Sequence, residues 1–375
     1  MDIQELKKRF ESSFDRPPEA AFRAPGRVNL IGEHTDYNDG YVLPMAIEKE
    51  TVAIVAGRDD MTARIISTRK GEPVEFGLDS ITRGEPQWVN YCRGVAAGLI
   101  ESGMKPRGCD ILVESTVPLG GGLSSSASLE VATALAMMHV FGGELGDMEL
   151  ARLCQKAEHE FAGMPCGIMD QAISILGKEG SALLLDCRSG ETQLIPFDNP
   201  DLVLLVCNTN VKHSLADGEY AKRRQKCHEA AETLGVESLR DASMQQVEKL
   251  EGDHLKRARH VVGEIKRTAE AVKALEASDY GRFGELMYGS HDSLRDDYEV
   301  SCAELDKVVS TAAGAEGVYG ARMTGGGFGG CAIVLVDAKK APEVTEKIAS
   351  EYHDEFDREC TLFSTTAANG AGKAE

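Results

Sequence analysis

The order of apolar and polar positions divides the chain into a strand-rich first half and a helix-rich second half. Short apolar and β-branched runs predict strands at residues 42–47, 51–56, 62–67, 109–116, 182–186, 202–208, 318–323 and 331–336. Apolar residues at helical spacing predict helices at residues 88–100, 129–141, 148–161, 220–234, 253–276 and 342–356. Strands and helices do not alternate regularly, which favours an α+β fold over a doubly wound sheet. We expect two domains, residues 1–195 and 196–375, with the last residues either packing back or fraying.

Composition narrows the class of protein. The 375 residues include 41 Lys and Arg against 61 Asp and Glu, a formal net charge of -20. A surface this acidic repels nucleic acid and anionic membranes. No apolar run approaches the ~18 residues that a membrane span needs, and the ten Cys form no C-x-x-C pair, which favours reduced thiols. We therefore expect a cytoplasmic protein, a monomer or weak homodimer, without a nucleic-acid or membrane partner.

A glycine- and serine-rich segment, PLGGGLSSSA at residues 118–127, leads into the long apolar helix. Its glycines let the backbone approach a ligand closely, and the helix N-terminus offers free N–H groups to a phosphate. The segment could therefore bind ATP, and the Ser126 hydroxyl could contact Mg²⁺. The same composition also describes a flexible turn with a serine N-cap. No P-loop or protein-kinase motif occurs in the chain.

A second segment, residues 26–40, places short polar groups between glycines. Such a density suits a ligand rich in hydroxyls, because each sugar hydroxyl needs a donor and an acceptor. It equally suits a surface loop of turn-forming residues. The polar side chains are Arg27, Asn29, Glu33, His34, Asp36 and Asn38.

Taken together, the motifs resemble those of the galactokinase family. The run GRVNLIGEHTDYN at residues 26–38 closely resembles the galactokinase signature. Residues 118–127 resemble the ATP motif of the wider superfamily of galactokinase, homoserine kinase, mevalonate kinase and phosphomevalonate kinase (GHMP kinases), and GGGFGG at residues 325–330 is similar to its third motif. GIMDQ at residues 167–171 also matches galactokinases, as do HSL at residues 213–215 and the nearby Glu219, Tyr220, Arg223 and Arg224.

The resemblance implies a fold and a reaction. The fold is a mixed-sheet N-terminal domain and a C-terminal domain of antiparallel sheet plus helices, with the active site in the cleft between them. The reaction is transfer of the γ-phosphoryl group of ATP to O1 of α-D-galactose, giving α-D-galactose 1-phosphate and ADP. This is the first committed step of galactose catabolism by the Leloir pathway.

The resemblance also implies roles for individual residues. Asp170 matches the catalytic Asp, which either takes the O1 proton or orients that hydroxyl, and Arg27 matches the Arg beside it, which stabilises charge on the transferring phosphoryl group. The matching sugar-binding residues are Glu33, His34, Thr35, Asp36, Gly167 and Tyr220. The matching ATP-binding residues are Gly120, Gly121, Gly122, Leu123, Ser124, Ser125, Ser126 and, by a looser similarity, Ser67.

The expected cofactor is Mg²⁺, with ATP as co-substrate. Ser126 and Glu158 match its ligands in the family. Helix arithmetic alone does not choose Glu158, because Glu158 and Glu160 sit on opposite shoulders of the apolar face. A helix N-cap is the other interpretation of Asp170 from its surroundings alone.

Three alternatives stand beside this interpretation. A sister sugar-1-kinase, such as N-acetylgalactosamine kinase, would share the motifs, because the sequence does not show the pocket near the sugar C2. A sugar and ATP sensor without catalysis is disfavoured, because such relatives lack a Ser-Ala pair that is present here as Ser126-Ala127. Mevalonate kinase is disfavoured because the block at residues 33–36 belongs to galactokinases.

Overall fold

The computed structural model describes residues 1–212 and 216–375. Its first half is built on a six-stranded sheet with the strand order β13-β1-β3-β6-β4-β5. Strands β4 and β6 run parallel and the other neighbours antiparallel, so the sheet is mixed. The strands are β1 (Ala20–Asn29), β3 (Pro44–Gly57), β4 (Thr62–Ser67), β5 (Val74–Gly77), β6 (Cys109–Ser115) and β13 (Gly372–Lys373).

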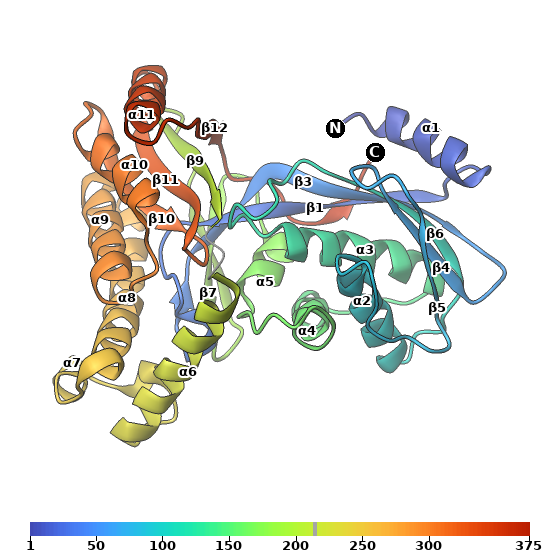
Figure 1. The fold of residues 1–375 in the computed structure, drawn as a ribbon, viewed down its shortest axis with the longest axis horizontal. Helices are drawn as coiled ribbons and strands as arrows, with labels where there is room; N and C mark the ends of the chain where they lie inside the picture. Colours follow the sequence, from blue (N-terminus) through green and yellow to red (C-terminus); the bar gives the residue numbers. More distant parts are fainter. Residues whose placement is uncertain (213–215) are drawn as a thin grey trace.

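Helices cover both faces of this sheet (Figure 1). One face packs on α1 (Ile3–Phe14), through a small cluster that includes Phe10 and Ile54. The other face packs against a larger apolar core contributed mainly by the longer helices. Those on that side are α2 (Val89–Glu101), α3 (Ser125–Phe141), α4 (Asp147–Ala157) and α5 (Met169–Leu176).

The second half is built on a four-stranded antiparallel sheet with the order β10-β11-β9-β12. Its strands are β9 (Leu202–Lys212), β10 (Val318–Thr324), β11 (Gly329–Asp337) and β12 (Thr361–Thr365). The associated helices are α6 (Ala216–Leu234), α7 (Met244–Val247), α8 (Gly252–Glu276), α9 (Tyr280–Asp296), α10 (Ala303–Ala313) and α11 (Ala341–Phe356).

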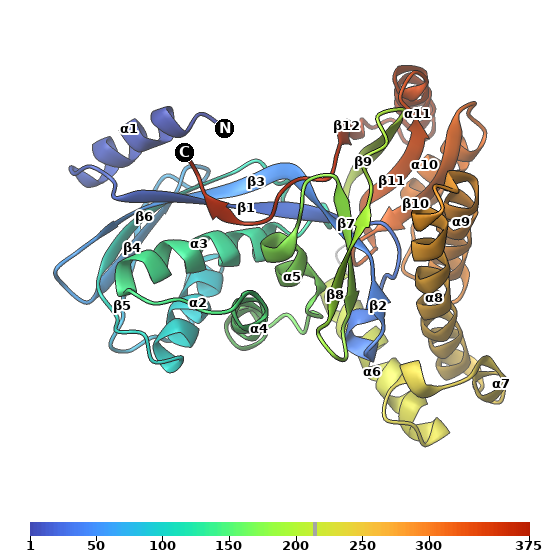
Figure 2. The same ribbon diagram turned by 180° about the vertical axis from the view of Figure 1, so that it is seen from behind.

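A small third sheet lies between the two halves (Figure 2). It consists of β2 (Tyr41–Val42), β7 (Ser181–Asp186) and β8 (Thr192–Pro196), with β7 in the middle. The α+β fold expected from the sequence, a mixed sheet followed by an antiparallel sheet with helices, is confirmed. The domain division at residue 195 stays a prediction.

The chain departs from the predicted elements in strand β3. Residues 42–47 and 51–56 were expected as two strands, but Pro44–Gly57 form one continuous strand. The polar residues Glu48, Lys49 and Glu50 interrupt the apolar pattern without interrupting the backbone pairing, because Pro25 still pairs with Glu50 across the sheet. A β-bulge in β1 between Pro25 and Arg27 accommodates the irregularity.

The last residues pack back on the first half of the protein. After β12 the chain leaves the four-stranded sheet, and β13 pairs with β1 at Phe22 and Arg23. On the way, the backbone N–H groups of Gly370 and Ala371 donate hydrogen bonds to the carbonyls of Gly177 (2.7 Å) and Ser174 (2.8 Å), at the end of α5. Both ends of the chain therefore lie near α1 (Figures 1 and 2).

The helices in the described ranges were compared with the requirements of a bilayer. None of them combines the length and the apolar character of a membrane-crossing segment.

Candidate active site

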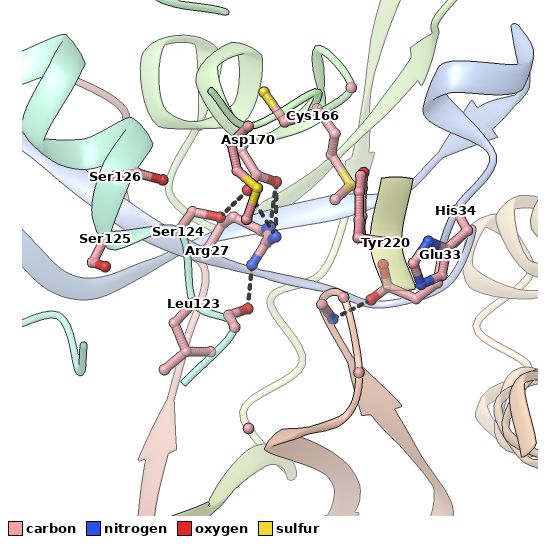
Figure 3. Close-up of a pocket in the computed structure, with 18 of the residues that line it drawn as sticks. Arg27, Glu33, His34, Leu123, Ser124, Ser125, Ser126, Cys166, Asp170 and Tyr220 are labelled. Atoms are coloured by element: carbon pink, nitrogen blue, oxygen red, sulfur yellow. Dashed lines mark hydrogen bonds and ion pairs between the residues drawn. The ribbon is translucent and has the colours of Figure 1, made fainter. Parts of the chain in front are cut away.

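A cavity of about 280 Å³ opens where the first half of the protein meets the β10–β11 loop (Figure 3). Three segments that are distant in sequence contribute most of its walls: the polar N-terminal motif, the glycine- and serine-rich loop before α3, and the glycines of residues 325–330. The cavity therefore collects the motifs that the sequence singled out. Its lining residues are Arg27, Glu33, His34, Asp36, Gly120, Gly122, Leu123, Ser124, Ser125, Ser126, Glu158, Met164, Cys166, Gly167, Met169, Asp170, Tyr220 and residues 325–330.

The loop before α3 presents the N-terminus of that helix to the cavity. Gly120 and Gly122 both have φ of +70°, a conformation that glycine adopts without strain. Ser124 occupies the N-cap position, but its side chain does not cap the helix; its hydroxyl donates to Asp170 Oδ2 at 2.6 Å. The first N–H groups of a 17-residue helix thus stay free of a side-chain cap. They can bind an anionic group such as phosphate.

Arg27 and Asp170 form an ion pair in the middle of the cavity (Figure 3). Arg27 lies on β1 just after the bulge and is 4% exposed, and Asp170 lies in the first turn of α5. Arg27 Nε donates to Asp170 Oδ1 at 2.8 Å and Nη2 to Asp170 Oδ2 at 2.9 Å, a bidentate arrangement. Arg27 also donates to the carbonyl of Gly122 in the phosphate loop. The pair is therefore fixed in one orientation beside that loop.

Glu33 anchors the opposite end of the cavity to the second half of the protein. Its Oε1 accepts hydrogen bonds from the Gly325 N–H (2.6 Å) and the Thr324 hydroxyl (3.1 Å). Arg322, which is fully buried, lies with Nη1 3.6 Å from the same oxygen. Burial raises the pKa of Glu33, and the charges of Arg322 and Arg27 oppose that rise. The polar N-terminal motif and the third glycine motif thus meet at this carboxylate.

The His34 side chain is held as a neutral ring. Burial, together with the neighbouring His260, lowers its pKa to about 3. Its Nδ1 hydrogen-bonds the Tyr37 hydroxyl at 2.8 Å, and its ring packs against Tyr220 with centroids 5.5 Å apart. The buried Nε2 has no hydrogen-bond partner among the described residues. This nitrogen is a group that a ligand hydroxyl could satisfy.

Asp36 lies directly against Gly167. A Cβ added to Gly167 would overlap the Asp36 carboxylate, so only glycine fits beside this side chain. Burial, and then the negative charge of Asp170, raises the pKa of Asp36 to about 7. Asp36 is thus a carboxyl group whose charge changes near neutral pH.

Ser126 and Glu158 line the cavity next to the catalytic pair. Glu158 begins a π-helical turn, residues 158–162, that continues α4, and such turns are frequent at functional sites. Burial, and then the charge of Asp170, raises the pKa of Glu158 to about 7, while hydrogen bonds from Ser126, Cys166 and Gln171 oppose the rise.

The charge of the cavity favours a bound cation. Four carboxyl groups line it against the single guanidinium of Arg27. In the described ranges, no cluster of three or more His, Cys, Asp or Glu could hold a metal by itself. Magnesium needs no such cluster, because it is usually bound by one or two carboxylates together with phosphate oxygens and waters. A hydroxyl and a carboxylate at Ser126 and Glu158 therefore fit Mg²⁺ that arrives with ATP.

Three of the residues expected in the site lie outside the cavity. Thr35 is buried, and its hydroxyl donates to the carbonyls of Gly32 and Tyr41, which shapes the polar motif from behind. Gly121 faces away, toward Asn208. Ser67 ends β4, where its carbonyl accepts hydrogen bonds in a turn.

The remaining family motif lies around the start of α6. The matched residues 213–215 fall outside the described residues. Glu219 forms an ion pair with Arg223 at 2.8 Å, and Arg224 donates to the Pro165 carbonyl at 2.8 Å.

The structure adds lining residues that the sequence analysis did not select. They are the sulfur-containing side chains Met164, Cys166 and Met169 and the ring of Phe328. All flank or interrupt motifs that were recognised, and their position next to the polar residues was the available signal.

Comparisons with known proteins agree with this site. The family models described as "Galactokinase galactose-binding signature", "GHMP kinases N terminal domain" and "GHMP kinases C terminal" match residues 8–57, 90–178 and 271–354. The chain is 49% identical to Homo sapiens galactokinase over 98% of this chain and 96% of that protein. It is 45% identical to galactokinase of Chloroflexus aggregans over 99% and 97%.

Solved structures share the fold. The crystal structure of Lactococcus lactis galactokinase complexed with galactose superposes with a TM-score of 0.96 at 34% identity, covering 100% of both chains. Methanococcus jannaschii mevalonate kinase superposes with a TM-score of 0.69 at 22% identity over 93% of this chain and 98% of that one. The second likeness concerns the fold alone.

Proposed function

The chain belongs to the galactokinase family and is an ATP-dependent galactose kinase, and we propose that its active site is the cavity around Asp170. In this proposal the γ-phosphoryl group of ATP passes to O1 of α-D-galactose. The bond between O1 and the γ-phosphorus forms while the bond from that phosphorus to the β-γ bridging oxygen breaks. The products are α-D-galactose 1-phosphate and ADP.

One observation carries the proposal: the Asp170 carboxylate lies where the phosphate loop and the sugar-binding motif meet. Ser124 of the loop donates to its Oδ2, and Arg27 of the polar motif donates to both its oxygens. A substrate hydroxyl between the two motifs would face this carboxylate. Asp170 then accepts the O1 proton or orients the hydroxyl for attack.

Arg27 has two roles in the proposal. It fixes the Asp170 carboxylate in one orientation, and it places a positive charge beside the loop that would hold the phosphates. Charge developing on the transferred phosphoryl group is stabilised by such a fixed guanidinium. Because the arginine is in place before substrate binds, no reorganisation is needed during the reaction.

The nucleotide would bind at the N-terminus of α3. The loop residues 120–126 surround its phosphates, with Gly121 and Ser67 supporting the site from outside the cavity. Ser126 and Glu158 would hold Mg²⁺, which neutralises phosphate charge when bound. The free N–H groups of the helix supply the rest of the electrostatic attraction in an otherwise acidic protein.

Galactose would bind at the end of the cavity lined by Glu33, His34, Asp36 and Tyr220. Carboxylates accept hydrogen bonds from sugar hydroxyls, and the neutral His34 ring can offer either a donor or an acceptor at Nε2. Thr35 would act indirectly, by holding the loop in shape. The cytoplasmic location, the monomer or weak homodimer and the division at residue 195 remain predictions.

The test is ADP release by the purified protein with Mg-ATP and D-galactose, run beside N-acetylgalactosamine, glucose and mevalonate. Turnover with galactose alone is expected. Turnover with only another sugar would keep the mechanism and refute the substrate. Tight galactose binding without ADP release from any acceptor would contradict catalysis and support a sensor.

A further inference from the structure

A buried carboxyl group that takes no part in the mechanism lies behind the active-site cavity. Glu130, on α3, is 0% exposed and does not line the cavity. Its Oε2 accepts a hydrogen bond from Gln171 Nε2 at 3.1 Å, and its Oε1 has no partner in the described part of the chain. A carboxyl group is costly to bury unless it has a purpose or a partner. Its one printed hydrogen-bond contact therefore suggests where it acts.

Gln171 carries this contact onward to the cavity. The same Nε2 that reaches Glu130 donates to Glu158 Oε2 at 2.7 Å, the shorter of the two bonds. Gln171 is also fully buried and directly follows Asp170 in α5. Glu130, Gln171 and Glu158 thus link α3, α5 and the π-helical turn after α4.

We propose that Glu130 is a positioning residue that acts through Gln171 to hold the Glu158 carboxylate in its orientation at the cavity wall. The inference rests on the proposed role of Glu158 toward Mg²⁺. Gln171 Nε2 could swing toward either carboxyl group, and the second acceptor at Glu130 fixes its side chain between them. Partners behind a metal ligand commonly tune it in this way, and their loss typically costs about 10–100-fold in metal affinity or activity.

The charge state of Glu130 agrees with this arrangement. Burial, and then the negative charge of Glu158, raises its pKa well above the ordinary range. A neutral carboxyl group still accepts a hydrogen bond from Gln171 and adds no repulsion to Glu158. A glutamine at position 130 would keep the size and the acceptor oxygen of a neutral acid.

The experiment compares four variants with the wild-type protein. Glu130→Leu removes the acceptor, Glu130→Gln keeps it, and Gln171→Leu removes the link between the two carboxyl groups. Thr133→Val is the matched control, since Thr133 is a buried polar residue of the same helix whose hydroxyl faces Cys92. The primary readout is ADP binding by calorimetry over a series of Mg²⁺ concentrations, beside galactose binding, kcat and Tm.

The expected result is specific to magnesium. Glu130→Leu and Gln171→Leu should raise the Mg²⁺ concentration for half-maximal ADP binding about tenfold or more. Galactose affinity should stay within about twofold, and Glu130→Gln and Thr133→Val should match the wild type. The double variant Glu130→Leu/Gln171→Leu should be no worse than Gln171→Leu, because the two residues act as one unit.

Several outcomes would overturn the inference. An unchanged Mg²⁺ dependence in Glu130→Leu would do so, as would equal damage in Glu130→Gln, or additive losses in the double variant. If Glu130→Leu does not fold, Gln171→Leu tests the same link from its middle. Glu158→Gln separates the two proposals: if it leaves Mg²⁺ dependence unchanged, the proposed role of Glu158 fails; if only Glu158→Gln changes it, this inference alone fails.

Discussion

Replacing Asp170 by asparagine removes the proposed proton acceptor with the least change of shape. The native carboxylate accepts three hydrogen bonds, two from Arg27 at 2.8 and 2.9 Å and one from Ser124 at 2.6 Å. Asparagine keeps one acceptor oxygen but turns an N–H group toward one of these donors, so at least one hydrogen bond is lost. The substitution therefore removes both the negative charge and the fixed orientation.

The expected loss falls on kcat. A positioned acid or base contributes about 10²–10⁴-fold to a rate, which corresponds to about 3–5 kcal/mol of activation free energy. Binding should change little, because Arg27, freed from its counter-charge, still attracts phosphate. We expect kcat of Asp170→Asn to fall by that factor, with galactose and ADP affinities within a few-fold of wild type.

A second signature of Asp170→Asn follows from its neighbours. Burial, and then the charge of Asp170, raises the pKa of Asp36 and of Glu158 to about 7. Removing that charge should lower both values, which would appear as a shift of the pH dependence of Tm. This readout does not depend on turnover.

The assay is coupled ADP release for kcat, with calorimetry for binding. Asp186→Asn is the matched control, because Asp186 also accepts two hydrogen bonds from one arginine, Arg240, but lies on β7 outside the cavity. A kcat of Asp170→Asn within a few-fold of wild type would refute the reasoning. So would an equal loss in Asp186→Asn, since any broken ion pair would then suffice.

Three further predictions concern the cation and the sugar end. Glu158→Gln should raise the Mg²⁺ concentration for half-maximal activity with little change in galactose KM; an unchanged magnesium titration would contradict its role. Asp36 has a raised folded-state pKa of about 7, so its contribution to stability falls as pH rises from about 4 to about 7. Asp36→Asn should therefore raise Tm more at pH 8 than at pH 4 in calorimetric scans, and equal gains at both would count against it. Gly167→Ala should displace Asp36 and raise galactose KM at least about tenfold while sparing ATP KM; an unchanged galactose KM would place Asp36 away from the sugar.

Local sequence signals predicted the elements that carry their own pattern. Strand β4 has the predicted bounds, and α3 ends at Phe141 as expected, because β-branched runs and long apolar helices depend mainly on nearby residues. The phosphate loop was likewise recognisable from its glycines and serines. By contrast, β1 (Ala20–Asn29) was missed, since it is buried on both faces and contains Pro25 and Gly26.

The site itself depends on contacts that no local pattern encodes. Arg27 and Asp170 are 143 residues apart and meet only through the packing of α5 on β1. Asp170 was open to interpretation as a helix N-cap, but the N-cap is Ile168 and Asp170 lies inside the first turn. Helix arithmetic could not choose Glu158, because the helix changes there to a π-helical turn whose geometry differs from 3.6 residues per turn. Family resemblance supplied what periodicity could not.

The return of the C-terminus to α5 has a consequence for how the protein is made. Gly370 and Ala371 bind carbonyls at the end of the helix that begins beside Asp170, and β13 then closes the edge of the first sheet. These residues leave the ribosome last, so a nascent chain can form most of the sheet but lacks the contacts that secure this helix. Pairing the two ends of the sequence also gives the fold long-range contacts that slow its final step. Catalytic competence is thus expected to arise only on release of the completed polypeptide.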